Sequence, residues 1–136
     1  MSKVIAVDFD GILFDDEYPE IGAPNIINLT LLAEEQCHGA KIILWTCRKG
    51  KQLRQAVRAC AVYGIHFDAV NRNLPEHIRK YHGDTRKIFA DEYWDDRAKT
   101  PADLRERYYR VCSCPANCVA RQSDYCRKCI EDGMNR

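Results

Sequence analysis

The sequence predicts an α/β protein of three layers, with a central parallel sheet between helices and a short cysteine-rich tail. Apolar runs typical of strands covered on both faces alternate with helical stretches. This alternation implies right-handed crossovers between parallel strands. The cysteines become dense near residue 111, which separates a predicted α/β domain (1–111) from the tail (112–136).

The predicted elements follow from local patterns. Apolar, largely β-branched runs give strands at 3–9, 41–46, 67–71 and 88–94. Apolar positions at helical spacing give helices at 25–38 and about 53–64, each ended by a glycine. Thr100 and Pro101 resemble an N-cap and first-turn pair, so a helix is expected from there to about Val111. Residues 74–86 are expected to form a loop with at most one helical turn.

The charge is balanced overall but unevenly distributed. The 136 residues suffice for one domain with a core, and 21 Lys and Arg face 20 Asp and Glu. That balance argues against a protein that binds polyanions with its whole surface. The first 36 residues hold eight acids and one lysine, so the remainder is basic. An acidic cluster beside a basic remainder suits a metal ion together with an anionic substrate.

The N-terminus indicates a cytoplasmic protein. The segment MSKVIAVDFD lacks the basic region, long apolar core and cleavage site of a signal peptide. No apolar stretch reaches the roughly 20 residues that span a bilayer, so no membrane association is expected. The eight cysteines are therefore interpreted as thiols or metal ligands before disulfides.

Polar residues lie at the carboxyl end of every predicted strand. They are Asp8 and Asp10, then Thr46, Cys47 and Arg48, then Asn71 and Arg72, and finally Asp95, Asp96 and Arg97. The carboxyl ends of parallel strands share one edge of the sheet, where ligands bind. A single Asp often ends a strand only because the strand meets solvent there. Four carboxylates together with a hydroxyl and several cations instead predict a phosphate pocket with a divalent cation, for which oxygen ligands favour Mg²⁺.

Four ordered segments resemble the motifs of the haloacid dehalogenase superfamily of aspartate-nucleophile phosphohydrolases. They are Asp8-Phe9-Asp10-Gly11-Ile12, Leu44-Trp45-Thr46, Lys87 and Asp95-Asp96. The likeness spans residues 3–97 and is most specific at the first motif, where Ile12 stands in place of the usual Thr or Val. The resemblance implies a Rossmann-like fold and an Mg²⁺-dependent phosphatase that forms an aspartyl-phosphate.

The resemblance also implies roles for the two first-motif acids and for the residues that bind phosphate. Asp8 would be the nucleophile, and Asp10 the general acid and base. Mg²⁺ would bridge Asp8 and the phosphate. Thr46 would bind a phosphate oxygen with help from the start of the following helix, and Lys87 would pair with the phosphoryl group and with Asp8. The residues expected to bind phosphate are Thr46, Cys47, Arg48 and Lys87.

The fourth motif completes the expected metal site. We expect Asp96 to bind the metal directly and Asp95 to orient Lys87 or a bound water. The residues expected to act as Mg²⁺ ligands are Asp8, Asp10, Asp95 and Asp96.

Ordinary surface roles remain open for several of these residues. Lys87 has other lysines and arginines close by in the sequence, and a surface lysine is the ordinary case. Arg48 and Arg72 either grip the leaving group or are solvated. The histidines are expected to be surface or loop residues: His38, His66, His77 and His82.

The spacing of the motifs leaves no room for a cap domain. About a dozen residues separate Ile12 from the first helix, and one helix, one strand and a loop fill the segment from Arg48 to Lys87. An uncapped site admits large substrates, such as nucleic acid ends or phosphoproteins, or relies on a partner to close it. Asp95-Asp96-Arg97 is also similar to the phosphatase half of polynucleotide kinases, and small uncapped hydrolase-like proteins of bacteria and phages are similar in length and layout.

The tail carries four thiols at spacings that suggest zinc. The expected ligands are Cys114, Cys118, Cys126 and Cys129. Few apolar residues lie between them, so a tetrahedral Zn²⁺ would supply the folding energy that burial cannot. Disulfide pairing and a disordered thiol-rich tail are the alternatives. Arginines and tyrosines near this end are compatible with nucleic acid binding, and a solvated helix with a stabilising clip is the simpler interpretation.

Two functions follow from these observations. The first is an Mg²⁺-dependent phosphohydrolase with an unidentified phosphomonoester substrate. The second is a non-catalytic binding module whose basic, cysteine-rich tail recruits nucleic acid or a protein partner. The presence of Asp8, Asp10, Thr46 and an acidic fourth motif favours the enzyme.

Overall fold

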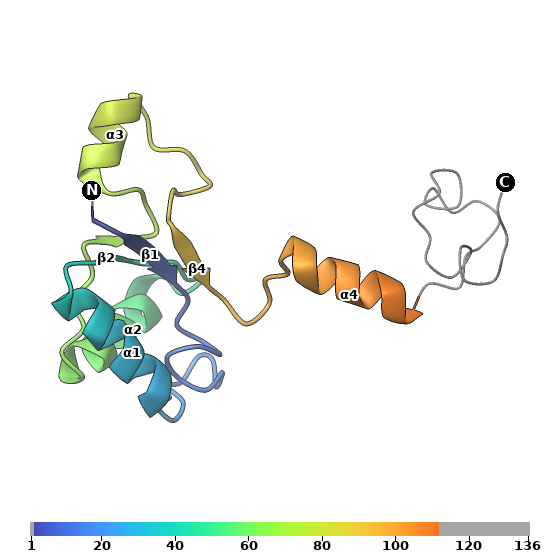
Figure 1. Ribbon diagram of the computed structural model, residues 1–136. Coiled ribbons are helices and arrows are strands. Elements are labelled where there is room, and N and C mark those ends of the chain that lie inside the picture. Colours follow the sequence, from blue (N-terminus) through green and yellow to red (C-terminus); the bar gives the residue numbers. More distant parts are fainter. Residues whose placement is uncertain (1, 112–136) are drawn as a thin grey trace, which may run out of the picture. The chain divides into compact units, whose positions relative to one another are not determined.

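The computed structural model describes residues 2–111 and contains a four-stranded parallel sheet (Figure 1). The strands are β1 (Val4–Val7), β2 (Lys41–Leu44), β3 (Ala69–Val70) and β4 (Glu92–Trp94), in the order β3-β2-β1-β4. The helices are α1 (Ile26–Cys37), α2 (Gly50–Val62), α3 (Pro75–Tyr81) and α4 (Pro101–Val111). The predicted α/β class with a central parallel sheet is confirmed.

The chain divides into two compact units. The first, Met1–Asp96, holds the whole sheet with α1, α2 and α3, and the second begins at Arg97 and includes α4. No separate domain interrupts the first unit between β1 and β4, as the motif spacing predicts. None of the helices within residues 2–111 is long and apolar enough to cross a membrane.

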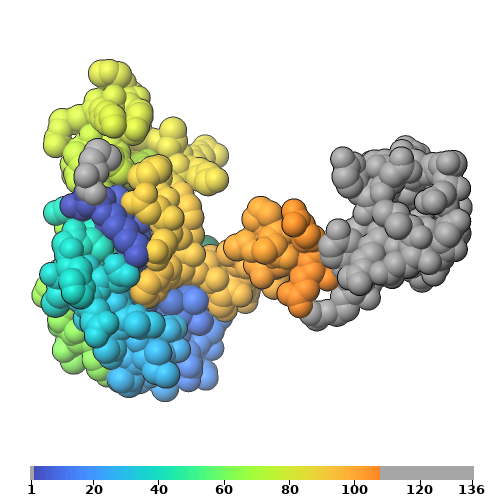
Figure 2. Space-filling model, viewed as in Figure 1, coloured from blue at the N-terminus to red at the C-terminus, as the bar shows by residue number. Residues whose placement is uncertain are grey.

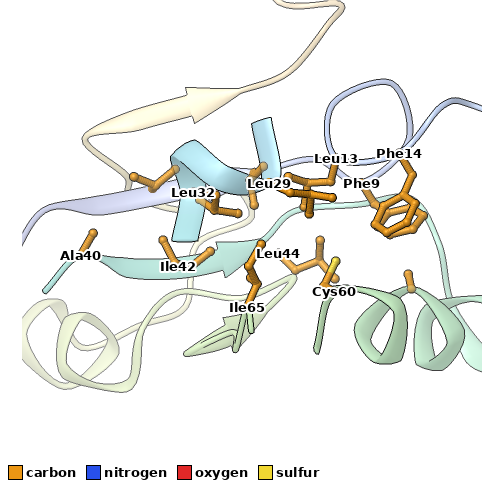
Figure 3. Packing of buried hydrophobic residues seen from close by; sticks show 13 residues of the cluster. Phe9, Leu13, Phe14, Leu29, Leu32, Ala40, Ile42, Leu44, Cys60 and Ile65 are labelled. Atoms are coloured by element: carbon orange, nitrogen blue, oxygen red, sulfur yellow. The ribbon is translucent and has the colours of Figure 1, made fainter. Parts of the chain in front are cut away.

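The two faces of the sheet carry separate apolar cores. On one face, α1 and α2 pack against alternate residues of β1 and β2, and Figure 3 shows this cluster. Its labelled members are Phe9, Leu13, Phe14, Leu29, Leu32, Ala40, Ile42, Leu44, Cys60 and Ile65. On the other face, Val4, Ala6 and Ile43 pack against Leu74 and Ile88, which flank α3. The sheet is therefore the middle of three layers.

The order of the strands explains which helix covers which face. From β1 the chain steps to β2 and then to β3 in one direction, and it next returns past β1 to β4. Right-handed crossovers place connections made in opposite directions on opposite faces of the sheet. Hence α1 and α2 share one face, and the connection that contains α3 crosses the other. The strand order therefore reverses at β1: β2 and β3 are added on one side of it, and β4 is added on the other, with all four strands parallel.

The fourth predicted strand is shorter in the structure because side chains hold its first half in an irregular path. The Asn73 side chain accepts from the amide of Phe89 at 2.8 Å and donates to Asp84 Oδ1 at 2.8 Å. Ile88 and Ala90 are buried, so their apolar character reflects packing and not strand pairing. Regular pairing with β1 begins only at Glu92.

The segment 74–86, predicted to be a loop, contains the seven-residue helix α3. Pro75 occupies its first turn and His82 ends it in the left-handed conformation, with φ 56°. His77 of this helix is buried against the rings of Tyr81 and Phe89, so the expectation of a surface histidine is wrong at this position.

Side-chain caps start α1 and α4 where the sequence predicts. Asn25 accepts from the Asn28 amide at 3.0 Å. Thr100 Oγ1 accepts from the Asp103 amide at 3.2 Å, and Asp103 Oδ2 accepts from the Thr100 amide at 2.8 Å. This reciprocal pair satisfies backbone donors that the first turn leaves unpaired.

The start of β1 lies between α1 and the segment that leads into β4, as Figure 2 shows in dark blue, cyan and gold. Lys3 links the two neighbours on the surface, because its Nζ lies 3.0 Å from Glu35 Oε1 and 2.7 Å from Glu92 Oε1. Inside, burial raises the pKa of the Cys60 thiol to about 12, so Cys60 is a packing residue and not a reactive thiol.

Candidate active site

Four side chains form a row across the carboxyl end of the sheet. The register Val7–Leu44, Val7–Trp94 and Leu44–Val70 continues for one more residue on each strand. Amides one residue past the strands still donate to the neighbouring strand, from Asp8 to Trp94, from Trp45 to Val7 and from Asn71 to Leu44, at 2.8–2.9 Å. The residues of this end row, in spatial order, are Asn71, Trp45, Asp8 and Asp95.

The end row lies on the same face of the sheet as the core beside α3. Side chains alternate along a strand, and Ala6, Ile43 and Ala69, two residues earlier, belong to that core. The four end-row residues, together with Thr46 and Cys47, line an open pocket. The pocket is therefore the continuation of one core face beyond the point where the helical cover stops.

Three carboxylates converge at one end of the row. One oxygen each from Asp8, Asp95 and Asp96 lies within 4.8 Å of the others. Asp8 directly follows β1, and the other two follow β4. The group therefore lies between the neighbouring strands at which the strand order reverses. This is the usual ligand site of an open parallel sheet. Carboxylate oxygens at this spacing could hold a hard divalent cation.

The environment of Asp8 disfavours its charge. Burial raises the pKa of Asp8 to about 6, and the charges of Asp95, Asp10 and Asp96 push it in the same direction. A hydrogen bond from the Phe9 amide to Asp8 Oδ1, at 2.7 Å, opposes the shift. A cation at this position would relieve the repulsion among the carboxylates.

The turn after β2 presents a hydroxyl to the pocket. The Thr46 amide donates to Asn71 Oδ1 at 2.8 Å, and Thr46 Oγ1 accepts from the Arg48 amide at 3.1 Å. These bonds fix the turn and leave the hydroxyl proton of Thr46 as a donor for an anion. Cys47 is exposed in the same pocket. Thus Thr46 and Cys47 lie where a phosphate site at Asp8 requires them.

Asp10 and Arg48 form a buried ion pair with each other. Arg48 Nη2 lies 2.7 Å from Asp10 Oδ1, and Arg48 Nε lies 2.8 Å from Asp10 Oδ2. The Arg48 side chain is 1% exposed and that of Asp10 is 17% exposed. Two predictions are therefore corrected. Asp10 is not among the carboxylates whose oxygens converge, and Arg48 is buried against Asp10 and does not line the pocket, in contrast to the predicted ligand and phosphate-binding positions.

The guanidinium of Arg48 also holds the loop between β1 and α1. It donates to the carbonyl oxygens of Pro19 at 3.0 Å and Glu20 at 2.7 Å. It lies 4.9 Å from the centre of the Phe9 ring and 5.1 Å from that of Tyr18. Hydrogen bonds with Asp10 raise the pKa of Arg48, which therefore stays charged. One buried cation thus joins the first motif, the loop and the turn after β2.

Two groups of predicted site residues remain outside this pocket. Lys87 is exposed, and the structure does not place it among the pocket residues. The predicted zinc ligands lie outside the described residues, as does the rest of the tail: Cys114, Cys118, Cys126 and Cys129.

Gly11 leaves space for one of the three carboxylates, a role that the predicted set of ligands does not include. Its φ is +87°, and a Cβ at this position would lie 2.4 Å from Asp96 Oδ2. The missing side chain therefore makes room for the Asp96 carboxylate. The signal in the sequence was the glycine directly after Asp10, which the motif includes.

Trp45 and Asn71 are the other pocket residues that the predicted ligand set omits. Both follow strands, and the sequence places Trp45 directly before Thr46. Their contribution could not be predicted without the register, because only pairing shows which strand-end residues share a face with Asp8.

The fold and the pocket define a class of parallel α/β protein with an acidic pocket at the point where the strand order reverses. No protein-family model and no curated protein matches the chain. The structure is similar to that of a conserved protein from Bacteroides thetaiotaomicron, with a TM-score of 0.64 and 31% sequence identity over 81% of this chain and 91% of that one. The chain belongs to the family of this conserved bacterial protein.

Replacing Arg48 by Met should destabilise the fold strongly. The change leaves the carboxylate of Asp10 without its partner, and breaking a buried pair from one side costs about 3–5 kcal/mol. Urea unfolding measures the loss. The matched control is Lys3→Met, which breaks two surface ion pairs and should cost much less. Equal losses in the two variants would show that the Arg48 pair is not a structural requirement.

Replacing Gly11 by Ala should weaken binding of a divalent cation by about tenfold or more, because the new Cβ displaces Asp96. Calorimetric titration with Mg²⁺ or Mn²⁺ measures the affinity. The control is Gly39→Ala, since Gly39 also has a positive φ, +93°, but no atom lies within 4 Å of the added Cβ. Both variants should lose about 1–2 kcal/mol of stability from backbone strain, and only Gly11→Ala should lose cation affinity. Equal affinity in both would contradict the role of Gly11.

Proposed function

We propose that the protein is an Mg²⁺-dependent phosphohydrolase that forms an aspartyl-phosphate on Asp8 while it hydrolyses a phosphomonoester. The observation that carries this proposal is the convergence of Asp8, Asp95 and Asp96, whose oxygens lie within 4.8 Å of one another in the described chain. Thr46 lines the same pocket as Asp8 and Asp95. The resemblance to the haloacid dehalogenase motifs supports the same chemistry at the same residues.

In this proposal Asp8 supplies the nucleophile, and Thr46 supplies a hydrogen-bond donor while the aspartyl-phosphate forms and is hydrolysed. Asp8 is half-buried and held by the Phe9 amide, so its second oxygen has a fixed direction of attack on phosphorus. The P–O bond to the leaving group breaks as the bond to Asp8 forms, and water then cleaves the aspartyl-phosphate and regenerates the carboxylate. The Thr46 hydroxyl, which lines the same pocket, would donate to a phosphoryl oxygen in both steps.

The donor set of the acidic group fits Mg²⁺. Three carboxylates provide hard oxygen ligands, and Mg²⁺ commonly uses one or two carboxylates together with phosphate oxygens and waters. Asp8, Asp95 and Asp96 would hold the ion, which when bound neutralises negative charge on the transferring group.

The pairing of Asp10 with Arg48 supports the second candidate, a non-catalytic binding module whose basic, cysteine-rich tail recruits nucleic acid or a protein partner and whose pocket would bind phosphate without turnover. The proposed acid and base role needs an Asp10 oxygen to turn toward the leaving group, and that movement costs hydrogen bonds of 2.7 and 2.8 Å to Arg48. A protein that only binds a phosphorylated nucleic acid or protein would have no need for this movement. The two candidates share the pocket and differ in turnover.

The enzyme is tested with a generic aryl phosphate, with and without Mg²⁺. Asp8→Asn should lower kcat on the order of a thousandfold or more, because no carboxylate remains to form the covalent intermediate. Removal of Mg²⁺ with EDTA should have a comparable effect. Asp15→Asn, at an exposed acid of the loop after β1, is the matched control and should retain activity. Unchanged turnover in Asp8→Asn would refute the nucleophile, and Mg²⁺-dependent phosphate binding without any turnover would favour the binding module.

The tail is tested by its metal content. The proposal includes a cytoplasmic location, where thiols stay reduced and can bind zinc. Protein purified under reducing conditions should contain one Zn²⁺ per chain, and Cys126→Ser with Cys129→Ser should remove it. Cys37→Ser, at an exposed cysteine that ends α1, should leave the zinc content unchanged. Wild-type protein without zinc would refute this site.

A further inference from the structure

An exposed tryptophan lines the pocket beside the candidate nucleophile. Trp45 is 36% exposed and is the large aromatic side chain among the described residues of this pocket. Its pocket neighbours are polar: Asp8, Thr46, Cys47, Asn71 and Asp95. Single exposed aromatic residues are common on protein surfaces, and others on this molecule, such as Tyr81, lie away from the pocket. The position of Trp45 within a polar site therefore requires a separate explanation.

The backbone holds Trp45 in a fixed position. Its amide donates to the Val7 carbonyl at 2.8 Å, directly before Asp8, and the next amide, of Thr46, donates to Asn71 Oδ1 at 2.8 Å. The residue is therefore anchored at both peptide groups. A tryptophan has only two side-chain torsions, so an anchored one can contact a ligand at low entropic cost.

The end row sets the separation between Trp45 and the acidic group. Trp45 and Asp8 are side by side on neighbouring strands, about 4.8 Å apart at the backbone, and their side chains share a face of the sheet. A phosphate held at Asp8 would therefore bring the organic part of its ester over Trp45. Asn71 follows in the row; its Oδ1 accepts from the Thr46 amide, and its NH₂ group is a hydrogen-bond donor that could face the edge of a base.

We propose that the substrate is a nucleotide phosphate, free or at the end of a nucleic acid strand, whose base stacks on Trp45 while its phosphate lies at Asp8. This proposal rests on the proposed function and adds the class of substrate. A planar base presents a π-face to the indole, and the pocket that Trp45 lines is open. Trp45 thus determines specificity, while Asp8 carries the chemistry.

The test compares AMP with ribose 5-phosphate, which share the sugar and phosphate and differ only in the base. For wild type, kcat/KM should be higher for AMP. Trp45→Ala should reduce the ratio of the two values by about 5- to 150-fold, the range expected for loss of one stacked base. Trp45→Phe should retain most of the preference, because the ring remains. Each variant is judged by the ratio of the two kcat/KM values, so that a general loss of activity is not counted as loss of base recognition.

The control variant is Tyr81→Ala, which removes an exposed aromatic ring on α3 outside the pocket and should leave the ratio unchanged. A 3′- or 5′-phosphorylated trinucleotide, compared with AMP, distinguishes a nucleic acid end from a free nucleotide. A wild-type enzyme that does not discriminate AMP from ribose 5-phosphate would overturn the proposal. A Trp45-dependent preference for a phosphotyrosine peptide over AMP would also overturn it.

Failure of the proposed function gives a different result. If no phosphoester is hydrolysed, calorimetric titration with AMP and ribose 5-phosphate in the presence of Mg²⁺ tests Trp45 by affinity. Tighter binding of AMP that Trp45→Ala abolishes would support base recognition by a protein that is not a phosphatase. Hydrolysis of both compounds at rates independent of Trp45 would instead support the phosphatase and refute base recognition.

Discussion

The position of β1 in the middle of the sheet determines where this molecule can bind a ligand. β1 pairs with β2 on one side and with β4 on the other, and the order in which strands are added to the sheet reverses at this point. The connections on the two sides lie on opposite faces, so neither covers the end of β1. Asp8 and Asp95 meet there because the register Val7–Trp94 continues for one residue. The acidic group is thus a consequence of strand order together with three strand-end carboxylates.

The two acids of the first motif, although two residues apart, have different electrostatic environments. Asp10 faces a buried guanidinium that balances its charge, whereas Asp8 faces two other carboxylates. Within the described residues, Arg48 lies within hydrogen-bonding distance of Asp10, whereas burial, followed by the charges of the neighbouring carboxylates, raises the pKa of Asp8 to about 6. Thus one acid of the motif is paired within the protein, and the other lies among carboxylates at the pocket.

Much of this architecture could be predicted from the sequence because it depends on local patterns. Apolar runs and helical stripes predicted the parallel sheet and its main helices, and the cap at Thr100 predicted the start of α4. Patterns failed where tertiary contacts override them. The Ile88–Ala90 segment is apolar because it fills the core, although Asn73 holds it out of the sheet. His77 is buried for a similar reason, since short α3 packs it between two rings.

The candidate site also contains residues whose position could be predicted from the sequence and one whose position could not. Asp8, Thr46, Asp95 and Asp96 could be predicted because each follows a strand, and the sheet geometry alone brings strand ends together. The role of Arg48 could not, because its position after Thr46 is equally compatible with a phosphate ligand and with a buried partner of Asp10. The burial of Arg48 affects which groups could stabilise negative charge in the pocket. The Arg48 guanidinium donates to Asp10 and to two loop carbonyls, so under the proposed function the charge of a transferring phosphoryl group would have to be balanced by other groups, such as a cation at Asp8, Asp95 and Asp96. Catalysis in this molecule would therefore depend on the ion more than in a site with an arginine at the phosphate.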